Sequence, residues 1–306
     1  MSKFFGRQYR VEIGSEETGK KVWDSRDSRD PLQLRFLIDT SFGGAYSTMQ
    51  LSIFNVNKES IGQVMEADRV VLQAGYQDAF GVIFDGTIAN LNAPKQGVNR
   101  ILDVFCWSGL DRVQQKPATV SFAPDTSYFE IVDHIATDLF SKKPRYVGFS
   151  DDFKEAMGKA TDGYNALQPH STLLDKLGDD FGFDWLIEGD TVLLFENGKH
   201  RDGEPYLISP ETGLVGGVAL TWQGADVEMK LDPTIQIGDR VKVQSQATSI
   251  NFSSIYQVNL PEEKKVIGDG VFVVKAMRRQ GDFYGQNTWT SELTCWREGE
   301  NGQGLR

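Results

Sequence analysis

Alternating apolar and polar residues run through the first hundred positions of the chain. In five segments every second residue is apolar, which is the pattern of a β-strand with one buried face. The apolar sets are Tyr9, Val11 and Ile13; Leu32, Leu34, Phe36 and Ile38; Met49, Leu51 and Ile53; Val70, Leu72 and Ala74; and Leu102, Val104 and Cys106. Short alternating strands separated by turn signals predict a β-barrel or a β-sandwich.

Residues 113–200 follow a different, helical pattern. Ser127 and Glu130 have the spacing of a capping box, which predicts a helix that starts there. The apolar residues of this helix recur at helical spacing and are Phe129, Ile131, Val132, Ile135, Ala136 and Leu139. A second helix is predicted from Ser171 to about Gly182, with inward-facing Leu173, Leu174 and Leu177, and a third, weaker one over 150–158. The segment FDWLIEGDTVLLFENG predicts a β-hairpin with Glu-Gly-Asp as its turn.

Two distant segments of the chain have nearly the same strand sequence. ADRVVLQAG at 67–75 matches GDRVKVQSQ at 238–246, at an offset of 171 residues. Further along, GVIF at 81–84 matches GVFV at 270–273 at an offset of 189, and the same offset aligns Cys106-Trp107 with Cys295-Trp296. Three aligned segments predict a duplicated β module. The second copy then carries 18 extra residues between about 245 and 269, in a loop that could meet a partner.

The two cysteines do not form a disulfide framework. Cys106 and Cys295 are the only two in 306 residues, and each precedes a tryptophan. We expect both to be small buried hydrophobes on equivalent strands of separate copies. A bridge between Cys106 and Cys295 is the alternative.

These patterns together predict a mainly β, α+β fold. Two similar β-barrel domains, at 1–112 and 201–306, are expected to flank a small α/β domain at 113–200. The length agrees with more than one domain.

The acidic balance excludes some classes of partner. The formal net charge is −11, and the isoelectric point is about 4.9. A net negative surface disfavours non-specific binding to nucleic acid or to anionic membranes. No apolar run approaches the length of a membrane span, and the first residues, MSKFFGRQYRVEIG, lack the apolar core of a signal peptide. We therefore expect a protein that starts in the cytosol, with no membrane partner and no sequence-specific nucleic-acid partner.

No active site is evident in the sequence. His134, His170 and His200 have no second ligand at zinc spacing, and none of the HExxH, GxSxG or Walker patterns occurs. The loop over 213–217 has extra glycine but lacks the surroundings of a dinucleotide site, and the loop over 23–31 offers too few oxygens for calcium. We expect no catalytic, cofactor-binding or metal-binding residues and no cofactor. The interface residues that would meet partners stay undefined.

Several segments resemble the baseplate hub proteins of contractile-tailed bacteriophages. LSIFNVNKES and ADRVVLQAGYQDAFGVIFDGTI resemble their first barrel, and STLLDKLGDDFGFDWLIEGDTVLLFENG resembles their middle domain. LISPETGLVGG, LDPTIQIGDRVKV and YGQNTWTSELTCW are similar to parts of their second barrel. The resemblance spans about residues 5–298. Late control protein D and the hub part of type VI secretion spikes are more distant relatives.

The resemblance implies a structural virion protein and not an enzyme. It implies a homotrimer in which two barrels per chain give a pseudo-hexameric ring, joining the six-fold tail tube to the three-fold central spike and letting DNA pass. The implied partners are further copies of the chain, the central spike, the tail tube or its initiator, and baseplate wedge proteins. The implied location is the tail baseplate of the virion, after assembly in the host cytoplasm. If part of the negative charge lined the lumen, DNA would be repelled from its wall.

Three other functions are compatible with parts of the sequence. A tail-associated peptidoglycan hydrolase could use the pairs Asp151-Asp152 or Asp179-Asp180 as its carboxylates. A carbohydrate-binding module could use Trp185, Trp222 or Trp289 as sugar platforms, although aromatic residues of β proteins are more often core. A type VI secretion hub would assemble in the same way. The short length without a fused spike favours a phage protein over a secretion hub.

Overall fold

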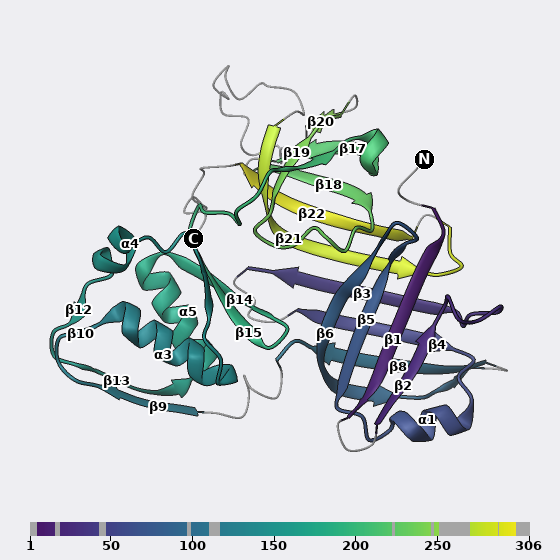
Figure 1. The fold of residues 1–306 in the computed structure, drawn as a ribbon, viewed down its shortest axis with the longest axis horizontal. Helices are drawn as coiled ribbons and strands as arrows, with labels where there is room; N and C mark the ends of the chain where they lie inside the picture. The colour runs from purple at the N-terminus through teal and green to yellow at the C-terminus, as the bar shows by residue number, and fades with distance from the viewer. Residues whose placement is uncertain are drawn as a thin grey trace.

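The computed structural model is mainly β and has three regions, which Figure 1 shows side by side. We use the names first β region, middle region and second β region for residues 5–109, 117–200 and 206–297. The residues that the structure describes are 5–15, 19–42, 47–96, 99–109, 117–221, 224–245, 248–250, 270–286 and 288–297.

The first β region holds eight strands and one short helix. They are β1 (Arg7–Ser15), β2 (Gly19–Asp24), β3 (Leu34–Ser41), β4 (Thr48–Phe54), α1 (Lys58–Val64), β5 (Arg69–Tyr76), β6 (Ala79–Asn92), β7 (Lys95–Gln96) and β8 (Asn99–Trp107). All five strands expected from alternation are present, and their apolar residues from Leu34 onward in β3 are buried as predicted.

The middle region mixes helices with small sheets. Its elements are β9 (Pro117–Phe122), β10 (Thr126–Ser127), α3 (Tyr128–Phe140), β11 (Arg145–Val147), α4 (Asp151–Ala156), β12 (Lys159–Ala160), β13 (Tyr164–Pro169), α5 (His170–Phe181), β14 (Phe183–Glu188) and β15 (Thr191–Glu196). Strands β14 and β15 form the predicted hairpin, and β11 adds to β15 in parallel. No helix in the described part of the chain is long and apolar enough to cross a membrane.

The caps of the middle helices follow the sequence in two cases of three. Ser127 caps α3 with the predicted capping box, because its hydroxyl accepts from the Glu130 amide while the Glu130 carboxylate accepts from the Ser127 amide. Ser150 caps α4, which is the predicted third helix. The expected cap at Ser171 is wrong: α5 begins one residue earlier, after Pro169, whose fixed φ suits a helix start. Helix α5 ends at Gly182, whose φ of 79° is left-handed.

The second β region repeats the strand order of the first. Its elements are β16 (Tyr206–Ile208), η1 (Pro210–Thr212), β17 (Leu214–Leu220), β18 (Gly224–Lys230), β19 (Arg240–Val243), β20 (Thr248–Ile250), β21 (Gly270–Asp282) and β22 (Trp289–Arg297). In the first region the strands pair in the order β1-β5-β6-β8-β4-β3, and in the second in the order β16-β19-β21-β22-β18-β17. The predicted duplication is therefore present as a matching order of pairing, with one difference: β1 pairs with β5 antiparallel, whereas β16 pairs with β19 in parallel.

The two copies correspond at offsets that the sequence match did not give. Arg69 pairs with Thr87 and Arg240 pairs with Val273, so β6 corresponds to β21 at an offset of 186, from 87 to 273. The predicted offset of 189 at this strand is wrong by three residues, because a Gly-Val-apolar run recurs in both strands out of register. Cys106 and Cys295 do correspond. Cys106 pairs with Ile88 of β6 and Cys295 pairs with Val274 of β21, and a register shift follows each of these pairs.

The main sheet is continuous from one copy into the other. Strand β3 pairs with β4 on one side and with β21 on the other, so the two copies share one fifteen-stranded sheet. Among the described strands the pairing does not close into a ring, and two separate closed barrels are not what this sheet shows. Alternation predicts strands and their faces but carries no information on which edge meets which.

Three clusters of buried side chains form the cores. The first belongs to the first β region but includes Leu231 and Trp289 from the second. The second fills the middle region, and the third fills the second β region. The hairpin β14–β15 joins the last two, because Trp185 and Ile187 face the middle core while Leu186 and Phe195 face the other. Burial on both faces explains its nearly unbroken apolar sequence.

Candidate functional site

The place where the two copies meet is the most distinctive site of the molecule. We call it the seam: the antiparallel pairing of β3 with β21, which runs over seven residue pairs from Ser41 opposite Ala276 to Arg35 opposite Asp282. Two ion pairs bridge it on the exposed face, each with 2.7 Å between a guanidinium Nε and a carboxylate oxygen: Arg278 with Asp39, and Arg35 with Asp282. Exposed pairs of this kind add little stability, so the seam rests mainly on its ladder and its buried side.

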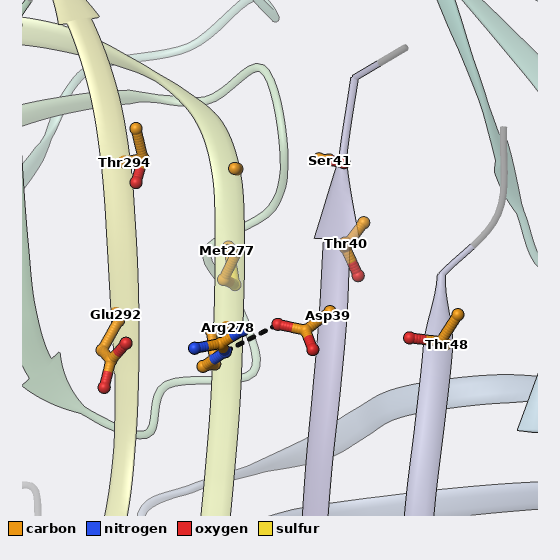
Figure 2. A pocket seen from close by; sticks show the side chains of 9 residues that line it. Asp39, Thr40, Ser41, Thr48, Met277, Arg278, Glu292 and Thr294 are labelled. Atoms are coloured by element: carbon orange, nitrogen blue, oxygen red, sulfur yellow. Dashed lines mark hydrogen bonds and ion pairs between the residues drawn. The ribbon is translucent and has the colours of Figure 1, made fainter. Parts of the chain in front are cut away.

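A polar groove of about 450 Å³ lies on the exposed face of the seam. Figure 2 shows Arg278 reaching toward Asp39, with Glu292 on the neighbouring strand. The other lining residues are Thr40, Ser41, Thr48, Ala276, Met277 and Thr294. Arg278 is already paired, and the hydroxyls are not joined to a base in a nucleophile–base–orienter chain. The groove therefore presents an ion pair and several hydroxyl groups.

The buried side of the seam is held by Trp289, the first residue of β22. Its side chain is 1% exposed and packs edge-on against Phe36 of the first copy, with 5.2 Å between ring centroids. Its indole Nε1 donates to the Gly75 carbonyl oxygen at 3.0 Å, and its own carbonyl oxygen accepts from the Tyr76 hydroxyl at 3.1 Å. A residue of the second copy thus completes the core of the first.

A buried arginine reinforces the same junction. Arg279 of β21 donates through Nη2 to the Ile235 carbonyl oxygen at 2.6 Å and through Nη1 to that of Ile83 at 3.4 Å. Burial lowers the pKa of Arg279 to about 10, and the charges of Asp232 and Asp239 oppose that shift. The guanidinium of β21 thus joins β6 of the first copy, through Ile83, to the loop before β19 of the second, through Ile235.

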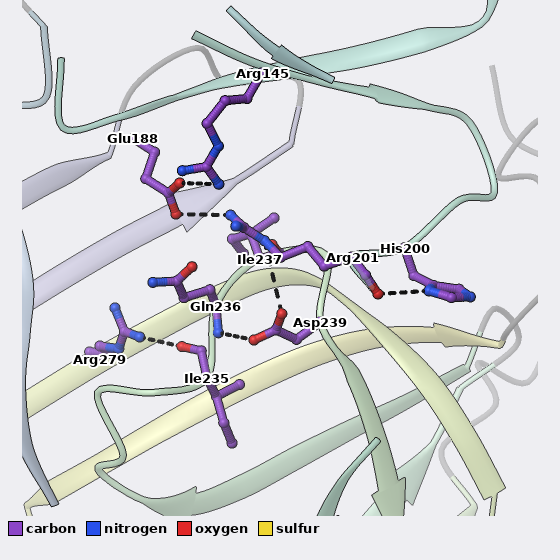
Figure 3. A network of polar contacts seen from close by, with 9 residues as sticks. All are labelled: Arg145, Glu188, His200, Arg201, Ile235, Gln236, Ile237, Asp239 and Arg279. Atoms are coloured by element: carbon purple, nitrogen blue, oxygen red, sulfur yellow. Dashed lines mark hydrogen bonds and ion pairs between the residues drawn. The ribbon is translucent and has the colours of Figure 1, made fainter. Parts of the chain in front are cut away.

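A second polar network attaches the middle region to the second β region, and Figure 3 shows it. Glu188, at the hairpin turn, accepts from Arg201 Nη2 at 2.9 Å and lies 3.0 Å from Nη2 of Arg145. Arg201 also donates through Nε to the Ile237 carbonyl oxygen at 2.8 Å. The pKa of the neighbouring Asp239 is raised, because the effect of burial exceeds the opposing effect of the hydrogen bond from the Gln236 amide. These contacts join the middle region to the second β region.

Lys275 occupies the bulge of β21 beside the seam. It is 7% exposed, and its Nζ lies 4.7 Å from the ring centroid of Phe42 and 5.0 Å from that of Trp296. Burial lowers its pKa, and the charge of Asp184 in the middle region opposes that effect. The lysine therefore sits where all three regions meet.

The carboxylate pairs proposed for a hydrolase are exposed and separate. Asp151 and Asp152 lie in the first turn of α4, and Asp179 and Asp180 lie at the end of α5. Neither pair lines the groove at the seam. A glycosidase needs its two carboxylates to face each other across a cleft, and these helix-end positions do not provide one.

The histidines lie apart from one another. His134 is exposed on α3 against Phe122, His170 is buried 2.7 Å from a carboxylate oxygen of Asp138, and His200 Nδ1 lies 2.9 Å from the Arg201 carbonyl oxygen. Within the described ranges no three His, Cys, Asp or Glu side chains gather as a metal site would require.

The cysteines and tryptophans are core residues where they are described. Cys106 and Cys295 are free and buried, and burial raises the pKa of both thiols. Trp185 and Trp289 are 2% and 1% exposed, so neither is a sugar platform. Trp222 and most of the insertion between about 245 and 269 lie outside the described residues.

The net charge is concentrated off the main sheet. The middle region holds 7 Lys and Arg against 15 Asp and Glu, a net charge of −8 out of the −11 of the whole chain. The sheet itself pairs opposite charges, as in Arg69 with Asp85, whose Nη2–oxygen distance is 2.8 Å. The expectation that part of the negative charge lines a channel stays a prediction, and the middle region carries most of that charge.

The comparisons with known proteins agree on one class. A family described as baseplate hub gp41 matches residues 48–253. A search of curated proteins finds no match. One similar solved structure is a tail protein from Neisseria meningitidis, with a TM-score of 0.59 and 12% identity over 96% of this chain and 98% of that one. Another is a 43 kDa tail protein of prophage MuSo2 from Shewanella oneidensis, with a TM-score of 0.59 and 8% identity over 96% of this chain and 97% of that one. The E. coli c3393 protein, a type VI secretion component with structural similarity to T4 tail proteins gp27 and gp5, is also similar. Its TM-score is 0.58 and its identity 10%, over 95% of this chain and 78% of that one. At these identities the structures show a shared fold.

Proposed function

Because the chain belongs to the baseplate hub gp41 family of phage tail structural proteins, we propose that it forms the homotrimeric ring between the tail tube and the central spike. The observation that supports this most is the seam. Each chain already joins two copies of one β module edge to edge. Three chains would supply six such modules, which matches a six-fold tube above and a three-fold spike below.

The proposed domains are a first tube-like domain at 1–112, a middle domain at 113–200 and a second tube-like domain at 201–306. The separate core of the middle region and the matching strand order of the other two support these boundaries. The proposed partners are further copies of the chain, the spike, the tail tube or its initiator, and wedge proteins. The proposed location is the tail baseplate, after assembly in the host cytoplasm, with DNA passing through the ring.

A structural function without catalysis fits the side chains. The acidic pairs lie exposed at helix ends, and the two described tryptophans are buried, so neither the hydrolase nor the sugar-binding alternative gains support. The similarity to a type VI secretion component concerns the fold. The family match favours the phage tail over the secretion system.

The test is the mass of the protein in solution. Light scattering behind a sizing column, with and without the candidate spike protein of the same virus, should give three times 34.2 kDa for the hub, alone or bound to the spike. A stable monomer of 34.2 kDa that ignores the spike would refute the ring.

A further inference from the structure

The exposed face of the seam carries an ordered row of charged residues. Arg278 of β21 pairs with Asp39 of β3 on one side and with Glu292 of β22 on the other. Glu228 of β18 extends the row, because it pairs with Glu292. Figure 2 shows the first three side chains at one level, with Thr48 next in line on β4. The row therefore crosses from one copy of the β module into the other.

A row of short side chains lies beside the charged row. Ala276 pairs with Ser41 across the seam and with Thr294 on its other side. These three residues line the groove of about 450 Å³, and Asp226 continues their row on β18, opposite Thr294. The backbone groups of these strands already pair in the ladder, so a bound ligand meets side chains, among them the hydroxyl groups of Ser41 and Thr294.

The two rows together carry a surplus of negative charge. They hold four carboxylates against one guanidinium, a net charge of −3: Asp39, Asp226, Glu228 and Glu292 against Arg278. The guanidinium is already paired, with 2.7 Å between Arg278 Nε and a carboxylate oxygen of Asp39. The surplus therefore lies on β18 and β22, and this part of the face favours a cationic ligand over an anionic one.

The pairing of Glu228 with Glu292 departs from the usual pattern of a sheet face. Like charges directly opposite each other on neighbouring strands destabilise a sheet. Gln280 Nε2 donates to a Glu292 carboxylate oxygen at 3.2 Å but brings no positive charge, and Lys230 lies in the next row, opposite Thr290. Departures from such local rules are expected at functional sites. A cationic group bound over the two carboxylates would relieve their repulsion.

We propose that the groove binds an extended basic segment of a partner protein, which lies across the strands of the seam. The strands β18, β22, β21 and β3 are neighbours in the sheet, so Glu228 and Asp39 stand roughly 14 Å apart at about 4.8 Å per strand. An extended segment of about five residues covers that length. Its alternate side chains point to the same side, so lysines or arginines at alternate positions would face the carboxylates. This surface belongs to a single chain, so the inference goes beyond the proposed ring.

The groove is complete only when the two copies have joined. Asp39 and Ser41 come from the first copy, and Arg278, Glu292 and Thr294 come from the second. A segment that lies across the groove therefore binds the folded chain and not the unfolded one, and it should raise the urea midpoint of the chain. A partner that recognises this surface would distinguish a finished chain from one whose seam has not formed.

The test uses the full-length chain and a fluorescently labelled peptide that alternates lysine with threonine, at low ionic strength. Fluorescence anisotropy should show binding that weakens at least about tenfold in the double variant Glu228→Gln with Glu292→Gln. Thr294→Tyr, which fills the groove without changing its charge, should also weaken binding. The matched control is Glu59→Gln with Glu66→Gln, two exposed carboxylates at α1, which should change the affinity by less than about twofold. A peptide that alternates glutamate with threonine should not bind.

The stability of the free chain gives a second readout. Glu228→Gln removes one of two opposed carboxylates, so its urea midpoint should rise while its affinity for the lysine peptide falls; a fall in both would indicate a structural role and overturn the inference. Unchanged affinity in the groove variants, equal losses in the control, or equal binding of the glutamate peptide also overturns it. The mass of the assembly is measured separately, so a trimer without groove binding leaves the proposed ring standing.

Discussion

Replacing Trp289 with alanine should uncouple the two β regions. The side chain is 1% exposed, and a buried tryptophan covers about 200 Å², worth up to about 5 kcal/mol at 25 cal/mol per Å². That area figure is an upper bound, because the unfolded chain already buries some of it. Loss of the indole hydrogen bond to the Gly75 carbonyl oxygen adds about 1 kcal/mol. We expect Trp289→Ala to lower the free energy of unfolding by about 4 kcal/mol.

The assay is urea unfolding followed by circular dichroism, at one protein concentration, because assembly would shift the midpoint. Trp289→Phe keeps most of the packing and loses the hydrogen bond, so it should cost about 1–2 kcal/mol. Leu167→Ala is the control, since Leu167 is 72% exposed and should change stability by no more than about 0.5 kcal/mol. A loss below about 1 kcal/mol for Trp289→Ala would refute the view that this residue completes the first core.

Two further substitutions test other parts of the structure. Burial lowers the pKa of Lys275 below its ordinary 10.5, so the unfolded chain binds more protons than the folded chain between the lowered pKa and 10.5, and stability should rise with pH across that window. Lys275→Met should remove this rise and increase stability at pH 7, whereas exposed Lys242→Met should do neither; an unchanged pH slope in Lys275→Met would contradict the burial argument. Ser127→Ala removes the cap of α3 and should cost about 1 kcal/mol in thermal or urea unfolding, against no comparable loss for exposed Thr172→Ala.

The sequence predicted what depends on local patterns. Alternation located the strands and their buried faces, and the capping box located the start of α3. The short helix α1 was missed, although Asn57 caps it through the Ser60 amide in a way that Asn followed by polar residues can signal. Ser171 was a reasonable cap residue, but Pro169 starts that helix.

The seam could not be predicted from the sequence. Strand β3 ends at residue 41 and β21 begins at residue 270, and the sequence of neither strand identifies the other as its partner. Arg279 and Trp289 had no local signal either, because their role comes from carbonyl groups and rings supplied by distant segments. The repeat gave the one usable clue, and its offset at β21 was off by three residues because short Gly-Val runs are not unique.

The distance between β3 and β21 in the chain has a consequence for synthesis on the ribosome. Strand β3 is complete at residue 41, whereas β21 begins at residue 270. At about 5–20 residues per second, roughly 10–50 s separate the emergence of the two strands. During that interval the nascent chain exposes the β3 edge and a core without Trp289. Chaperones that cover strand edges during synthesis should therefore increase the yield of folded protein.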